Sequence, residues 1–201
     1  MMKSALISGG LLVLFGCAAP QYDSVYQSQC SFSLDGDEAL TFKIKNDTAY
    51  LSGVVCDGSL DAFENMISQH PHIQMLVFES IDGSADDETN IDLAYRIREY
   101  GLDSYIAKTG HIASGGTDLF LAGVNRTVEP GAKIGVHSWS AGVDLEGKDL
   151  PRDHQEHNRY LDYYTDIGVN RDFYWFTLEA ASANDMHYMS MEELRKYGFM
   201  K

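Results

Sequence analysis

Blocks of apolar and polar positions alternate along residues 40–139, and the blocks differ in period. The stretch LTFKIKNDTAYLSGVV predicts two strands joined by a turn at Asn46 and Asp47. In the next segment, LDAFENMISQH, apolar residues recur at helical spacing, which predicts a helix with one buried face. The residues on that face are Leu60, Phe63, Met66 and Ile67.

The alternation of strand and helix continues from there. IQMLVFES predicts a buried strand, NIDLAYRIREYG predicts a helix that Gly101 ends, and DSYIAKT predicts another strand. SGGTDLFLAG then predicts a helix and AKIGVHSW a strand, and residues 150–185 have helical character with little strand propensity. Short buried strands that alternate with helices are typical of a parallel sheet covered by helices. The sequence therefore predicts an α/β domain over residues 36–201, with a mainly parallel sheet and flanking helices.

The first residues have the order of a secretory signal. Lys3 is followed by an apolar run over residues 5–15 and by small residues around Cys17, and the run is too short to span a bilayer. The tetrapeptide LFGC resembles the bacterial lipobox, in which the cysteine is lipidated and becomes the first residue of the mature chain. We therefore expect a lipoprotein signal peptide over residues 1–16, palmitate on Cys17, and a polar tether over residues 17–35. An ordinary cleaved signal, in which Cys17 has no role, is the alternative.

The expected location is the cell envelope, with the protein anchored by lipid and facing the periplasm. Ala18 after the cysteine indicates the outer rather than the inner membrane. Because the periplasm is oxidising, we expect Cys30 and Cys56 to form a disulfide, although one of them could instead be buried and unpaired. The disulfide would contribute about 3 kcal/mol to stability.

Charge and composition exclude several classes of partner. The chain of 201 residues has a formal net charge of −15, whereas nucleic acids and anionic lipid surfaces bind basic patches. We therefore expect no nucleic-acid partner. The acidic run over residues 82–90 lacks the spacing and closing glutamate of an EF-hand. The sequence predicts no metal and no cofactor.

The segment RYLDYYTDIGVNRDFYWFTLEA contains seven aromatic residues, more than a helix on the surface should expose. Either it is a core helix or it forms the contact face of a homo-oligomer. The sequence leaves both explanations open.

Five segments appear in an order that resembles the Clp-protease/crotonase superfamily, and in particular periplasmic Clp-like proteins of unassigned specificity. They are SGVVCDGSLDAFENMI, LVFESIDGS, IASGGTDLFLAG, VEPGAKIGVHSW and MSMEELRKYGF. The resemblance covers roughly residues 45–200 and implies the Clp/crotonase fold. In the Clp subunit a serine turn opens a helix, and a histidine later follows an apolar strand. Ser114 and His137 stand at these two positions.

The chemistry explains why these residue types belong together. A serine hydroxyl is a poor nucleophile until a base accepts its proton. Imidazole suits that role because its unperturbed pKa is about 6.5. Because Ser114 opens a helix, the Gly115 amide lacks a helical partner and can face an oxyanion. Gly83 matches the second glycine of the family's oxyanion turn, so the resemblance implies an oxyanion hole made by the Gly83 and Gly115 amides.

The chain departs from the family pattern at two acidic positions. Asp82 stands where the family has a glycine, and a carboxylate beside a developing oxyanion is unfavourable unless it points away. Asp118 lies one turn after Ser114, where the family prefers an apolar residue. Its side chain is expected either to face solvent or to contact His137.

The third member of a triad and the identity of the base have alternatives. By resemblance Asp185 would orient His137, but it is one residue out of register, and Asn184 is the neighbouring option. The serine turn also looks like that of signal peptide peptidase A enzymes, which use a lysine as base. Lys148 lies downstream where such a lysine could come, although its neighbours are charged.

We therefore hypothesise a membrane-anchored periplasmic serine hydrolase, a Clp-like peptidase, that acts on a peptide or protein. The alternative is a catalytically inactive Clp-like lipoprotein that binds peptides or a protein partner. Acyl-CoA chemistry is not expected, because CoA is scarce outside the cytoplasm and the sequence has no basic patch for its phosphates.

Overall fold

The computed structural model describes residues 21–140 and 145–200. The predicted signal peptide over residues 1–16, Cys17 and Ala18 lie outside the described residues. Within the described part, every helix is too short or too polar to cross a membrane.

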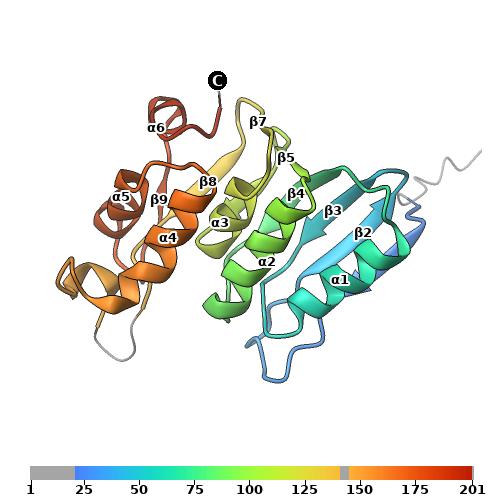
Figure 1. Cartoon of the computed structure of the whole chain (residues 1–201), viewed down its shortest axis with the longest axis horizontal. Helices are drawn as coiled ribbons and strands as arrows, with labels where there is room; N and C mark the ends of the chain where they lie inside the picture. The colour runs from blue at the N-terminus through green and yellow to red at the C-terminus, as the bar shows by residue number, and fades with distance from the viewer. Residues whose placement is uncertain (1–20, 141–144, 201) are drawn as a thin grey trace, which may run out of the picture.

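A single mixed sheet forms the centre of the molecule (Figure 1). Its strands are β1 (Ser24–Gln27), β2 (Thr41–Lys45), β3 (Thr48–Ser52), β4 (Met75–Ile81), β5 (Asp103–Ile106), β6 (His111–Ala113), β7 (Arg126–Val128), β8 (Lys133–Val136) and β9 (His187–Tyr188). The order is β1-β2-β3-β4-β6-β8-β9, and β5 joins β4 to β7. Strands β3 to β8 pair in parallel, whereas β1, β2 and β9 pair antiparallel with β2, β3 and β8 respectively. The predicted mainly parallel α/β architecture is confirmed.

The sheet forks along β4. Its first half, Met75 to Val77, pairs with β5, whereas its last two residues, Ser80 and Ile81, pair with β6. Strand β6 in turn pairs with β8, with Ala113 opposite Gly135. Because β4, β6 and β8 are parallel neighbours, the chain leaves all three at the same edge of the sheet.

Six α-helices among the described residues cover this sheet. They are α1 (Ser59–Gln69), α2 (Asp87–Glu99), α3 (Gly115–Leu121), α4 (Asn158–Asp166), α5 (Asp172–Ala180) and α6 (Met191–Lys196), with 3-10 turns over Gly147–Asp149 and Gln155–His157. Helices α1, α2 and α4 lie in a row in front of the sheet, and α5 and α6 gather beside β8 and β9 (Figure 1). Helix α1 buries Phe63, Met66 and Ile67 as the periodicity predicts, whereas Leu60 is only partly buried against the core.

The acidic run over residues 82–90 forms the entry into α2. The Asp86 side chain accepts a hydrogen bond of 2.9 Å from the Thr89 N–H and so caps the helix. Asp87 and Glu88 follow in the first turn, where the helix dipole favours negative charge. This run is therefore explained by helix capping.

The aromatic-rich segment belongs largely to the core. It forms two helices, α4 and α5, because Gly168 adopts a φ of 75° and breaks the segment between them. Tyr163, Tyr164, Phe173 and Tyr174 are buried. The half-buried Trp175 is partly covered by the Arg152 guanidinium, 4.6 Å from the ring centroid.

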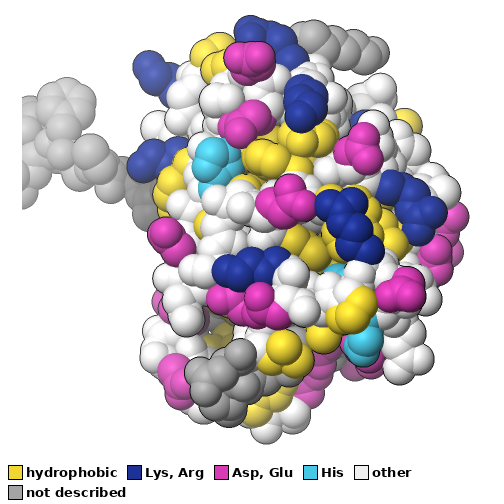
Figure 2. Space-filling model, turned by 90° about the vertical axis from the view of Figure 1, so that its left-hand side faces the viewer, with side chains coloured by type: hydrophobic (Ala, Val, Ile, Leu, Met, Phe, Trp, Pro, Cys, Tyr) yellow, Lys and Arg dark blue, Asp and Glu magenta, His cyan; other side chains and the backbone are white. Residues whose placement is uncertain are grey.

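The view from the side of α5 and α6 shows hydrophobic, basic and acidic side chains interleaved over this face (Figure 2). The remaining aromatic residues of the segment, Tyr160, Trp175 and Phe176, are partly buried and pack against the core. The core explanation accounts for the segment within one chain.

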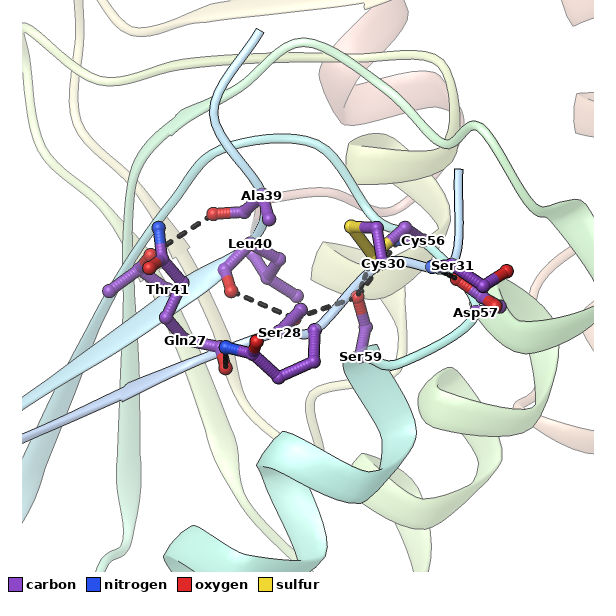
Figure 3. Close-up of a disulfide and its surroundings, with 11 residues drawn as sticks. Gln27, Ser28, Cys30, Ser31, Ala39, Leu40, Thr41, Cys56, Asp57 and Ser59 are labelled. Atoms are coloured by element: carbon purple, nitrogen blue, oxygen red, sulfur yellow. Dashed lines mark hydrogen bonds between the residues drawn. A yellow bond between two sulfur atoms is a disulfide. The ribbon is translucent and has the colours of Figure 1, made fainter. Parts of the chain in front are cut away.

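The predicted disulfide between Cys30 and Cys56 is confirmed, with the two Cα atoms 5.6 Å apart (Figure 3). Next to it, Ser28 Oγ donates a hydrogen bond of 2.8 Å to the Leu40 carbonyl. Ser28 Oγ also lies 2.9 Å from Oγ of Ser59, which is the first residue of α1. The chain before Cys30 is thus fastened to both β2 and α1.

The predicted tether over residues 17–35 is wrong for the part that the structure describes. Ser24–Gln27 form β1, an edge strand paired with β2. This strand has no continuous apolar face, since Val25 is 58% exposed, and it therefore lacks the alternating pattern that marks a half-buried strand. The folded domain begins before residue 36.

Candidate functional site

Ser114 occupies a strained turn between β6 and α3. Its backbone has φ 51° and ψ −127°, a conformation that residues with a side chain rarely adopt and that costs on the order of 1 to 3 kcal/mol. Two hydrogen bonds hold it: the Ser114 N–H donates to Gly135 O at 3.1 Å, and the Thr117 N–H donates to Ser114 O at 2.8 Å. A serine on a sharp strand-to-helix turn is the arrangement that exposes the nucleophilic hydroxyl in α/β-hydrolases.

The two glycines after Ser114 let this turn pack closely against the end of β4. A Cβ on Gly115 would lie 2.6 Å from Ser84 Oγ, and one on Gly116 would lie 2.8 Å from the Ile81 carbonyl oxygen. Asn90 of α2, which is buried, donates from Nδ2 to the Gly115 carbonyl at 3.2 Å. Asn90 therefore fixes the peptide group next to Ser114, and sequence reasoning missed it because it lies within the acidic run.

Gly83 faces Ser114 across the sheet edge. It has a φ of 151°, and a Cβ placed on it would lie 3.3 Å from Ser114 Cβ and 3.7 Å from Oγ. Neither the Gly83 nor the Gly115 N–H donates a hydrogen bond to any described residue. Two unpaired amides beside a serine hydroxyl have the composition of an oxyanion hole.

His137 directly follows β8 and is half-buried. Its Nδ1 lies 3.2 Å from the Ala183 carbonyl oxygen. Because a carbonyl only accepts, this contact assigns the proton of the neutral ring to Nδ1 and leaves Nε2 as an acceptor. The tautomer is the one that a general base requires.

Ser114 and His137 line the same narrow cavity, of about 40 Å³, together with residues of α2, α3, α4 and α5. That volume has room for about three water molecules. No hydrogen bond joins the two side chains in the described part of the chain. Such bonds are often long in empty sites and tighten when substrate binds.

The structure does not place Asp185 or Asn184 against His137. Asp185 is exposed, and its carboxylate accepts from the Met186 N–H at 2.8 Å. Asn184 is exposed as well. The Ala183 carbonyl holds the position that the resemblance assigns to the third member of a triad.

Asp82 points away from the proposed oxyanion hole. Its side chain is 63% exposed, and Oδ1 lies 3.1 Å from Nδ1 of His111. His111 Nε2 in turn lies 3.2 Å from the Tyr188 hydroxyl. The carboxylate at the position of the family's glycine is thus turned toward a histidine on β6 and does not line the cavity.

Asp118 takes neither of the two expected orientations. It is only 9% exposed, and its Oδ1 accepts a hydrogen bond of 2.5 Å from the Tyr164 hydroxyl. Burial raises the pKa of the Asp118 carboxyl to about 7, while the Tyr164 hydrogen bond opposes the rise and nearby Asp87 adds to it. Asp118 contributes a titratable group to the cavity wall next to Ser114.

Lys148 lies apart from the cavity. Its Nζ is 2.9 Å from Glu146 Oε2, and its side chain is 36% exposed. Lys148 is not among the residues that line the cavity beside Ser114, which disfavours it as the base.

Asp118→Asn should change the pH dependence of stability. The pKa of Asp118 is raised in the folded state, so below about pH 4 both states are protonated and the group has no effect, whereas ionisation between about pH 4 and pH 7 destabilises the fold. Relative to the variant, the wild type should lose stability over that interval, by on the order of 4 kcal/mol, and the difference should level off above it. Urea unfolding from pH 4 to pH 8 measures this. Exposed Asp92→Asn is the control, and parallel curves for wild type and Asp118→Asn would contradict the account.

No family model and no curated protein match the sequence. Solved structures do match. A mutant of the 1510-N membrane-bound stomatin-specific protease is 18% identical, covers 77% of this chain and 76% of its own, and has a TM-score of 0.52. A putative polyketide biosynthesis enoyl-CoA hydratase from Bacillus subtilis is 12% identical over 80% of this chain and 69% of its own, with a TM-score of 0.51. Methylmalonyl CoA decarboxylase is 8% identical over 81% of this chain and 67% of its own, with a TM-score of 0.50. Despite the low identity, a protease and acyl-CoA enzymes share this architecture with the chain, which therefore has the Clp/crotonase fold.

Proposed function

We propose that the protein is a serine hydrolase of Clp-like type, acting on peptide bonds, with Ser114 as nucleophile and His137 as base. The observation that carries this proposal is the geometry at the edge of the sheet. The strained turn presents the Ser114 hydroxyl beside Gly83, and His137 lines the same cavity. The likeness to a stomatin-specific protease supports a peptidase within this fold.

The proposed reaction is acyl transfer through the serine. The Ser114 oxygen attacks a peptide carbonyl while His137 Nε2 accepts its proton, and the carbonyl oxygen receives hydrogen bonds from the Gly83 and Gly115 amides. The imidazolium then gives the proton to the departing amine, and water releases the acyl group by the same steps. The Ala183 carbonyl keeps the ring in the required tautomer but does not supply a negative charge.

Acyl-CoA chemistry is the competing activity within this fold, since two of the similar structures are CoA enzymes. A CoA molecule carries several phosphate charges that need basic side chains. Among the described residues that line the cavity, Asp87 and Asp118 are acidic and none is lysine or arginine. The electrostatics of the cavity therefore disfavour CoA.

A fluorophosphonate probe should label the protein at Ser114. Because the probe reacts only with an activated serine, Ser114→Ala should abolish labelling while leaving the thermal midpoint within a few degrees of the wild type. Ser84→Ala is the matched control, since Ser84 also lies beside Gly115 but its hydroxyl donates to Asp87. Labelled peptides identified by mass spectrometry provide the readout.

The same labelling assay distinguishes between His137 and Lys148 as the base. His137→Ala should slow labelling by at least about a hundredfold, whereas Lys148→Ala should leave the rate within about twofold. The opposite order would assign the base to Lys148. Folded wild-type protein that takes no label would favour the inactive, peptide-binding alternative.

We further propose that Cys17 carries lipid and anchors the protein in the envelope, facing the periplasm and in the outer membrane. The support is the LFGC sequence and the presence of a disulfide, which suits an oxidising compartment. Cys17→Ser should block palmitate incorporation and leave the precursor uncleaved by the lipoprotein signal peptidase. Radiolabelled palmitate and gel mobility measure this, and normal processing of the variant would contradict it.

A further inference from the structure

The cavity beside Ser114 is lined by two carboxylates and, among the residues that the structure describes, by no lysine or arginine. Asp87 opens onto it from the first turn of α2, and Asp118 lines it from α3. The charge of Asp87 contributes to the raised pKa of Asp118, after the larger effect of burial. Among the described residues that form the cavity wall, His137 is the one group that can become positive.

Hydroxyl groups hold both carboxylates in place. Tyr164 donates to Asp118 at 2.5 Å, and Tyr160 donates to Asp87 Oδ2 at 2.9 Å. Ser84 donates to the other oxygen of Asp87. These partners fix the positions of the carboxylates but do not neutralise them, because a hydroxyl carries no charge.

Aromatic rings form one wall of the same cavity. Tyr160 stacks on Tyr174, with ring centroids 5.4 Å apart, and on Trp139, with centroids 6.1 Å apart. All three rings line the cavity. The Trp139 Nε1–H donates to the Tyr174 hydroxyl at 2.9 Å, which fixes the two rings relative to each other. Aromatic faces together with carboxylates are the usual composition of a site for an organic cation.

We propose that this cavity is the specificity site and receives the cationic side chain, lysine in the first place, of the residue whose carbonyl Ser114 attacks. The inference rests on the proposed function, since it deepens the same site. Ser114 and Gly115 line this cavity together with Asp118 and Tyr164, so a side chain next to the attacked carbonyl lies beside it. Its volume of about 40 Å³ suits a slim, unbranched chain that displaces a few waters.

The surface next to this cavity has room for the rest of a peptide. A wider hollow of about 450 Å³ shares Asp87, Trp139 and Tyr160 with the narrow cavity and extends along Leu150 and His154. A bound chain that places its lysine in the narrow cavity therefore has space for its neighbouring residues. Asp87 lies at the junction of the two hollows.

Binding to the Ser114→Ala protein tests the proposal without depending on catalysis. Three peptides of the form acetyl-Ala-Ala-Xaa-Ala-Ala amide, with lysine, norleucine or glutamate as Xaa, are titrated at pH 8 and followed by NMR chemical shifts. The titration is done at pH 8 because it lies above the pKa of about 7 of the Asp118 carboxyl. Norleucine matches lysine in length but lacks the ammonium, so the lysine peptide should bind roughly 10- to 100-fold more tightly, and the glutamate peptide most weakly.

Two variants in the same background assign the effect to the carboxylates. Asp118→Asn keeps an acceptor for Tyr164, and both it and Asp87→Asn should reduce the preference for lysine by about tenfold. Asp92→Asn, which removes a charge from the exposed side of α2, should leave the preference unchanged. Near-UV circular dichroism verifies that each variant is folded, and Asp87→Asn keeps the test valid if Asp118→Asn does not fold.

Equal affinity for lysine and norleucine peptides would overturn the proposal, and so would the absence of binding by the lysine peptide. A preference for lysine that survives both cavity variants would also overturn it. Phosphonate labelling of the wild type separates this result from the fate of the proposed function. Labelling at Ser114 without a lysine preference would leave a hydrolase of another specificity, whereas a lysine preference without labelling would leave a cation-binding groove.

Discussion

The arrangement of the site depends on the strained backbone of Ser114. A φ of 51° at a residue with a side chain persists only where its surroundings determine it, and here they do so from both sides. The parallel register of β6 and β8 places the Ser114 N–H against Gly135, while the absence of side chains on Gly115 and Gly116 lets α3 start close to β4. The fork of β4 brings Gly83 to the same edge, so sheet register sets the relative positions of Ser114 and the two amides.

The proposed mechanism develops negative charge on an oxyanion, which nearby carboxylates would disfavour, and the chain has a net charge of −15. Asp82 is turned outward onto His111, and Asp118 is buried against Tyr164 with a pKa raised to about 7. Asp87 and Asp118 line the same cavity as Ser114 and Gly115. These two carboxylates are the groups that we propose bind a cationic side chain.

The fold and part of the site were predictable from the sequence, because local patterns determine them. Hydrophobic periodicity predicts the alternating strands and helices, and an expected oxidising compartment predicts the Cys30–Cys56 disulfide. The resemblance to the family predicts that Ser114, His137 and Gly83 lie near one another. The β1 strand was missed because it lies at an edge with no buried stripe. The group that orients His137 was beyond prediction for a different reason: it is the carbonyl of Ala183, and a backbone atom leaves no residue type to recognise.

The central claim, that Ser114 reacts within an oxyanion hole, is tested most directly by a crystal structure of the protein after reaction with a small fluorophosphonate. The account predicts a phosphorus atom bonded to Ser114 Oγ, with one phosphoryl oxygen within about 3.1 Å of both the Gly83 and the Gly115 nitrogens. His137 Nε2 should lie within hydrogen-bond reach of Ser114 Oγ, and its Nδ1 should remain on the Ala183 carbonyl. An adduct on another residue, or a phosphoryl oxygen directed away from both amides, would contradict the account.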